Sequence, residues 1–228
     1  KDKCRVDLEI ENVLLENLLP DSPVFRQSGS ANLKIAIARS VEENQLDISA
    51  ALADWNINGQ QLGQFNFNAN GNTLMNAYVV NFDLAKDDKK ELKAKGIWQG
   101  LEEPTLNLDI ELDGLDLNFL SPLGKDAIKN IGGSITGNVN LWGPLNQLKH
   151  NGLLTLESAQ ISIPFLNVDY QAATTQVKLS NQEFFFMSTT LFEQAENTSA
   201  LLEGAFSHVN FRDWSLDLNI DSDRMLLL

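Results

Sequence analysis

One five-residue pattern, in which apolar residues alternate with acidic or polar ones, occurs three times in this chain. The copies are Val6-Asp7-Leu8-Glu9-Ile10, Leu108-Asp109-Ile110-Glu111-Leu112 and Leu216-Asp217-Leu218-Asn219-Ile220. Such alternation is typical of a β-strand that has one face on a hydrophobic interior and the other in water. The recurrence predicts long β repeats, because stacked repeats bury a face that one unit alone leaves open.

The spacing around the pattern also recurs and sets the expected boundaries. The positions Val13, Leu15, Leu18 and Pro20 match Leu115, Leu117, Leu120 and Pro122. We expect a first repeat over residues 1–104, a second over 105–212 and the start of a third over 213–228, within one continuous structural unit. Clusters of Gly, Asn and Asp between the alternating runs predict hairpin connections. The expected fold is therefore all-β: an elongated, curved antiparallel sheet of repeated meander units with an apolar interior.

One short helix is expected near residues 121–131. Ser121 suits the N-cap, Pro122 suits the first turn, and Gly132 can end the helix. One later strand, Phe184-Phe185-Phe186-Met187, is apolar on both faces. We interpret it as a central strand with the helix packed on its back, in preference to a partner surface.

Composition excludes some classes of function. The net charge of −14 and the pI near 4.4 disfavour binding to nucleic acid or to an anionic membrane surface, which both require Lys and Arg. Cys4 is the only cysteine, so an internal disulfide is impossible; its alternation with Val6 and Leu8 predicts a buried residue. The two histidines, His150 and His208, belong to no recognisable motif.

Two groups of acidic residues have the spacing of functional sites. Asp109, Glu111 and Asp113 alternate along one strand, as the carboxylates of jelly-roll glycosidases do. Asp7 and Glu9 repeat that arrangement, which favours the water face of an amphipathic strand. Calcium-loop spacing is present in Asp217, Asn219, Asp221 and Asp223, but the turn glycine is missing. We expect no enzymatic activity, no metal site and no cofactor.

Three consecutive strand patterns between residues 105 and 170 carry a family resemblance. They are a glycine-closed strand, a G-x-L-x-L strand, and a strand with an apolar–Pro–apolar turn. The corresponding residues are Ile131-Gly132-Gly133-Ser134-Ile135-Thr136-Gly137-Asn138-Val139-Asn140-Leu141-Trp142-Gly143-Pro144-Leu145, then Asn151-Gly152-Leu153-Leu154-Thr155-Leu156, then Ala159-Gln160-Ile161 with Pro164, Leu166 and Val168. This arrangement resembles the C-terminal region of TamB proteins, which are translocation and assembly module proteins of the AsmA-like group.

The resemblance implies a trough-shaped sheet, often called a β-taco, within a longer protein. It places that protein in the periplasm of a Gram-negative bacterium, anchored in the inner membrane by a helix outside this sequence. It implies an outer-membrane barrel protein as partner. The implied role is to conduct phospholipid between the inner and outer membranes, to assist outer-membrane protein assembly, or both.

The alternation itself predicts an inner wall of apolar side chains that could hold phospholipid acyl chains. Each buried methylene would contribute about 0.8 kcal/mol to such binding. The residues expected to line the wall are Leu108, Ile110, Leu112, Val139, Leu141, Leu154, Leu156, Ile161, Ile163 and Phe165. Two alternatives stay open. One is a structural or chaperone-like scaffold whose sheet edge pairs with client β-strands; the less favoured one is a sugar-binding β domain.

Overall fold

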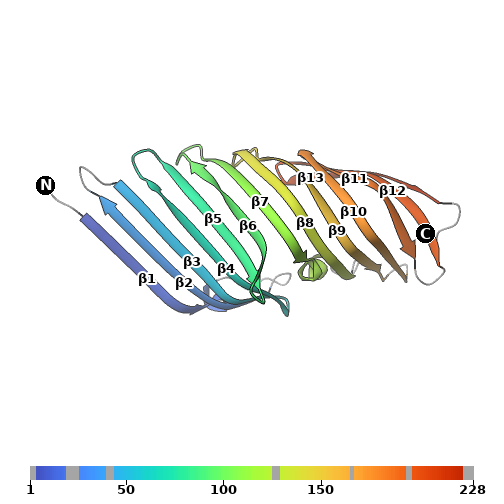
Figure 1. Cartoon of the computed structure of the whole chain (residues 1–228), viewed down its shortest axis with the longest axis horizontal. Coiled ribbons are helices and arrows are strands. Elements are labelled where there is room, and N and C mark those ends of the chain that lie inside the picture. Colours follow the sequence, from blue (N-terminus) through green and yellow to red (C-terminus); the bar gives the residue numbers. More distant parts are fainter. Residues whose placement is uncertain are drawn as a thin grey trace. The chain divides into compact units, whose positions relative to one another are not determined.

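The computed structural model describes residues 4–18, 26–39, 44–124, 129–164, 167–193 and 197–222, and strands dominate them. Within these residues, thirteen strands form one sheet in which each strand is hydrogen-bonded to the next in chain order (Figure 1). The defined pairings, among them β1 with β2 and β9 with β10, are antiparallel. The expected all-β antiparallel meander is therefore confirmed.

The strands differ little in length, and short turns connect most of them. They are β1 (Cys4–Leu14), β2 (Gln27–Arg39), β3 (Asn44–Ile57), β4 (Gln60–Asn72), β5 (Ala77–Lys86), β6 (Lys89–Gln99), β7 (Thr105–Asp116), β8 (Lys129–Pro144), β9 (Lys149–Ile163), β10 (Val168–Asn181), β11 (Glu183–Glu193), β12 (Thr198–Val209) and β13 (Arg212–Asp221). The three copies of the repeated pattern lie in β1, β7 and β13. These are the first, seventh and thirteenth strands of the described order, so five strands lie between successive copies.

Two short helical segments interrupt the strands in the described part of the chain. They are α1 (Leu15–Leu18) and the 3-10 helix η1 (Asn118–Gly124). The helix expected near residues 121–131 is thus shorter and displaced toward the N-terminus. Residues 129–131 begin β8, and residues 125–128 lie outside the described part. The local capping signals are overridden because Gly132, the expected end of the helix, lies inside β8, and the carbonyl of the next residue, Gly133, accepts a hydrogen bond from the Leu117 amide.

The chain divides into two compact units. The N-terminal unit comprises residues 1–110 and 141–148, and the C-terminal unit comprises residues 111–140 and 149–228. In the N-terminal unit, cross-strand register sets apolar residues beside one another, as in the row Leu8, Ile35, Ile48, Ala69 and Val80. Ala69, Val80 and Leu108 are the buried centre of this apolar face.

The apolar face of the C-terminal unit is centred on Leu154, Val177 and Leu179. The partly buried residues packed against this centre are Leu112, Ile135, Val139, Leu156, Phe184 and Phe186. Adjacent members are again cross-strand neighbours, because Val177 lies opposite both Leu154 on β9 and Phe186 on β11. Two phenylalanine rings therefore join the aliphatic side chains of this cluster.

In β9 and in β10 the alternation of inward and outward side chains shifts by one residue, and the two shifts lie beside each other in the sheet. Ser158 has a φ of 51°, in the left-handed region, and the alternation changes phase there. Leu154 is buried on one side of this point, while Ile161 lies on the other side, opposite the buried Tyr170. Two consecutive exposed residues at 173–174 give β10 the matching change of phase. A phase change in both strands keeps the apolar residues on a common face.

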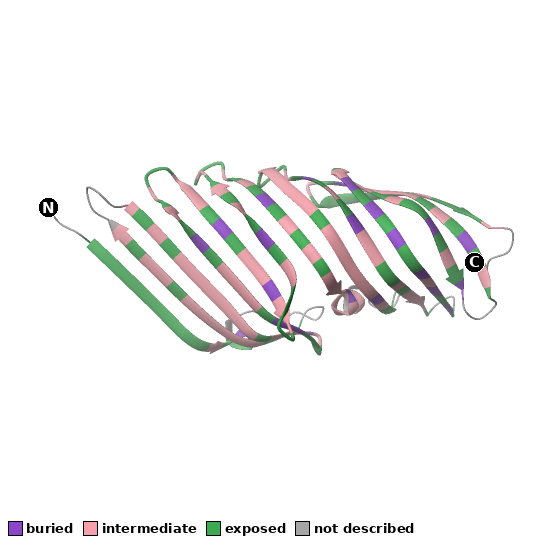
Figure 2. Ribbon diagram, in the orientation of Figure 1, coloured by how far each residue is buried: buried purple, intermediate pink, exposed green. Residues whose placement is uncertain are grey.

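Two expectations about burial are wrong. Phe185 and Met187 are 38% and 48% exposed, so nothing in the described residues covers the back of β11. Cys4 is exposed, because β1 is exposed along almost its whole length (Figure 2).

Candidate functional site

The expected wall residues of the N-terminal unit lie together. Leu108 is 6% exposed and forms the buried centre with Ala69 and Val80. Ile110 and Leu141, two further expected residues, pack against that centre. Aromatic side chains complete the layer, namely Phe67, Phe82 and Trp98.

The expected wall residues of the C-terminal unit lie in its own cluster. Leu154 belongs to the buried centre, and Leu112, Val139 and Leu156 pack against it. Two more expected residues, Ile161 and Ile163, are half-buried on β9 beyond the change of phase. Phe165 lies outside the described residues. Each unit therefore has an apolar face assembled from several of the predicted positions.

A strip of solvent-accessible apolar side chains borders the N-terminal cluster. Val6, Leu8 and Ile10 on β1 are 54%, 48% and 40% exposed. They pair in register with Ile37, Ile35 and Leu33 on β2, which places them on the same face as the buried centre. Figure 2 shows the gradient, with β1 exposed and buried positions recurring from β4 onward in this unit. An elongated apolar ligand could lie along this strip without any rearrangement of the core.

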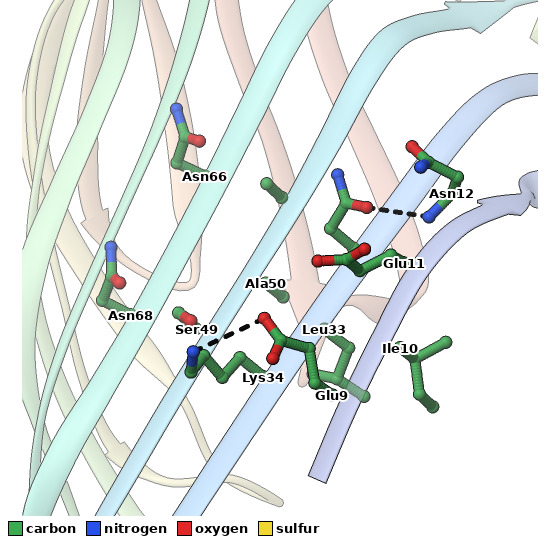
Figure 3. A pocket seen from close by; sticks show the side chains of 12 residues that line it. Glu9, Ile10, Glu11, Asn12, Leu33, Lys34, Ser49, Ala50, Asn66 and Asn68 are labelled. Atoms are coloured by element: carbon green, nitrogen blue, oxygen red, sulfur yellow. Dashed lines mark hydrogen bonds and ion pairs between the residues drawn. The ribbon is translucent and has the colours of Figure 1, made fainter.

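The opposite face of the N-terminal unit is polar and contains a hollow of about 470 Å³ (Figure 3). Its lining includes Glu9 on β1, Lys34 on β2, Ser49 on β3 and the amides of Asn66 and Asn68 on β4. Lys34 and Glu9 form an ion pair across the β1–β2 ladder, with 3.4 Å between Nζ and Oε1. Charged and amide groups would have to lose water against an acyl chain, so this hollow does not suit one.

A buried pair of histidines lies in the C-terminal unit. His150 on β9 is 1% exposed, His208 on β12 is 3% exposed, and their Nε2 atoms are 2.8 Å apart. These strands are separated by β10 and β11 in the sheet order, so this end of the unit must curl for the rings to meet. Rings from β11, the β12–β13 turn and β13 surround the pair, namely Phe184, Phe211 and Trp214.

The hydrogen bonds of the pair define its protonation. The Phe211 amide donates to Nδ1 of His208 at 3.0 Å, so a neutral His208 carries its proton on Nε2. That Nε2–H then donates to Nε2 of His150, whose own proton must be on Nδ1. Nδ1 of His150 is buried and has no partner among the described residues. A metal ion bound by both Nε2 atoms would require a proton on Nδ1 of His208, where the Phe211 amide already points.

Burial opposes a charge on either ring. Burial, and after it the charge of His208, lower the pKa of His150 to about 4. Burial also lowers the pKa of His208. Elsewhere in the unit, burial and the neighbouring Glu193 raise the pKa of Tyr170, which lies opposite Glu193 in the β10–β11 ladder.

The histidine pair was not recognised from the sequence. The signal that could have identified it is the two-residue period of a strand. His150 is on the same strand face as Gly152 and Leu154, and His208 is on the same face as Phe206. Both imidazoles therefore belong to the inward set of their strands. Their contact depends on the curl of the unit, which no local pattern encodes.

The carboxylates considered as catalytic groups, Asp109, Glu111 and Asp113, are all exposed on β7. No group of three His, Cys, Asp or Glu side chains in the described residues is placed to hold a metal ion. Nor is any helix in the described part long and apolar enough to cross a membrane. No family model, curated protein or solved structure matches the chain.

Proposed function

We propose that this protein shields lipid acyl chains on the apolar faces of its sheet. The observation that carries the proposal is the accessible strip of Val6, Leu8 and Ile10 beside the buried cluster of the N-terminal unit. An acyl chain laid along the strip would remove apolar surface from water on both partners, at about 0.8 kcal/mol for each methylene buried. No specific hydrogen bond is required, so chains of different length could bind.

The resemblance to TamB proteins supplies the proposed setting. The protein would be a periplasmic groove segment of a larger, inner-membrane-anchored protein in a Gram-negative bacterium. It would conduct phospholipid between the inner and outer membranes or assist the assembly of outer-membrane proteins, with an outer-membrane barrel protein as partner. The proposal assigns no catalytic step and no cofactor.

Mass spectrometry of organic extracts from the purified protein tests the proposal. We expect diacyl lipid to copurify with the wild type and to be depleted by Leu8→Glu, which puts a charge into the strip. Glu11→Gln is the matched control, because its side chain is exposed on the same strand and outside the strip. Lipid that is absent from the wild type, or equally abundant in both variants, would contradict the assignment.

A scaffold that pairs with client β-strands predicts a different result. Client assembly would then depend on the edge strand β1 while lipid binding played no part. An in vitro assembly assay for outer-membrane proteins, run on Leu8→Glu and wild type together, separates the two functions. Lost assembly without any bound lipid in the wild type would favour the scaffold.

A further inference from the structure

We propose that His150 and His208 form an acid-sensitive clasp, which holds β12 and β13 against β9 while both imidazoles are neutral and releases them when either is protonated. The clasp is a feature of the C-terminal unit alone and does not depend on the proposed lipid binding. It joins strands that are not neighbours in the sheet. Loss of this contact therefore removes a tertiary connection, and the ladders of β12 and β13 at the end of the described sheet then open more readily.

The geometry leaves no position for an additional proton. His150 could accept one only on Nε2, which already accepts the Nε2–H of His208. His208 could accept one only on Nδ1, which already accepts the Phe211 amide. Protonation of either ring therefore converts an acceptor nitrogen into an N–H donor that faces another donor. One of the two hydrogen bonds then breaks. A bond broken at Phe211 loosens the β12–β13 turn, and a bond broken between the rings separates β12 from β9.

No charged side chain of the described residues lies where it would stabilise the positive charge of a protonated ring. The charged residues nearest to the pair and its ring contacts on each strand are Lys149 on β9, Lys178 on β10, Glu183 on β11, Glu203 on β12, and Arg212 and Asp213 on β13. All six are exposed. The imidazole of His208 is the one charge that shifts the pKa of His150, and burial accounts for the shift of His208. A new imidazolium would therefore be buried without a counter-ion.

The direction of the pH dependence follows from these shifts. In the closed form the pKa of His150 is about 4, and in an opened form it returns toward 6.5. Below pH 6.5 the opened form binds a proton that the closed form does not, so the closed form loses stability as the pH falls toward 4. Above pH 6.5 both forms are neutral and the clasp is fully stabilising. Release would separate Trp214 from the ring of Phe184, which packs against the apolar centre of the unit.

Histidine NMR combined with hydrogen exchange tests the clasp on the intact chain. The sequence contains two histidines, so the ring carbon resonances report this pair without overlap. We expect both rings to stay neutral well below their ordinary pKa. As they protonate, amide protection in β12 and β13, corrected for intrinsic exchange, should fall about tenfold or more. Strands β4 and β5 of the N-terminal unit serve as the internal reference and should change less.

His150→Gln is the matched variant, because its Oε1 can accept the Nε2–H of His208 and cannot be protonated in this range. Because His208 keeps its own protonation site at Nδ1, we expect the loss of protection in β12 and β13 to move to a lower pH in this variant rather than to disappear. Two results would overturn the clasp. One is titration of both wild-type rings near pH 6.5 without loss of protection in β12 and β13. The other is an identical pH profile of protection in the variant and the wild type.

Discussion

The two units are built from the same alternating strands, yet their apolar faces end differently. In the N-terminal unit, small residues such as Ala50 and Ala69 share the face with larger ones, and its first strand leaves Leu8 accessible. Aromatic side chains pack on the buried centre of both units, but in the C-terminal unit the histidine pair also ties β9 to β12. Alternation thus decides which face is apolar, while long-range contacts decide how far that face is closed.

The largest expected difference between the units concerns a charge placed on each face. Val177 is 4% exposed and Ile37 is 40% exposed, and both lie on the apolar side of their strands. Val177→Asp should destabilise the protein by on the order of 4 kcal/mol, because it buries an ion without a partner. Ile37→Asp should cost about 1 kcal/mol or less, since water can reach its carboxylate.

Urea unfolding measures both free energies, with Lys178→Asp as the control at the exposed position next to Val177. Equal costs for Val177→Asp and Ile37→Asp would show that the two faces are equally accessible. The comparison between the units would then be wrong.

The alternation in the sequence indicates one face of a strand as apolar, but not which residues of that face are covered. Leu8 and Ile110 hold the same place in the repeated pattern, yet Leu8 is exposed on β1 and Ile110 packs against the N-terminal cluster. The cover comes from strands distant in sequence, so the pattern cannot contain it. The change of phase at Ser158 was likewise unpredictable, because a serine in the left-handed region has no distinct local signature.

The second prediction compares one substitution at two burial levels. Leu154→Ala in the C-terminal unit should cost about 2–5 kcal/mol, because it deletes buried methyl groups and leaves a cavity. Leu8→Ala in the N-terminal unit should change stability by about 0.5 kcal/mol, since half of that side chain is already in water. Chemical denaturation of the two variants gives both values. A cost above 2 kcal/mol for Leu8→Ala would mean that something covers β1.

The third prediction concerns close strand approach, where the units should behave alike. A Cβ on Gly96 would collide with the backbone of Asn107, and one on Gly152 would collide with the Asn138 carbonyl. Both Gly96→Ala and Gly152→Ala should therefore cost about 1–3 kcal/mol through backbone displacement. Thermal unfolding checks this against Gly59→Ala, where no atom lies within 4 Å and only the positive φ opposes a side chain. A neutral result at either glycine would rule out the close approach there.

The smallest effect is expected at the polar face of the N-terminal unit. Glu9→Gln removes the ion pair with Lys34, in which both side chains are more than half exposed. Stability should change by about 0.5 kcal/mol or less, because water and salt screen such pairs. The shift of the unfolding midpoint between low and high salt should then be the same in the variant and in the wild type. A larger loss that disappears in high salt would indicate a stronger electrostatic role for this face.

Site-specific photo-crosslinking tests the central claim, acyl-chain binding on one face of the sheet, most directly. A photoreactive amino acid is placed at Leu8, on the accessible apolar strip, or at Glu9, the next residue on the opposite face. After irradiation with vesicles of zwitterionic diacyl phospholipid, mass spectrometry of the protein counts lipid adducts. The account predicts adducts at position 8 and few or none at position 9. Equal capture at both positions, or capture at position 9 alone, would contradict it.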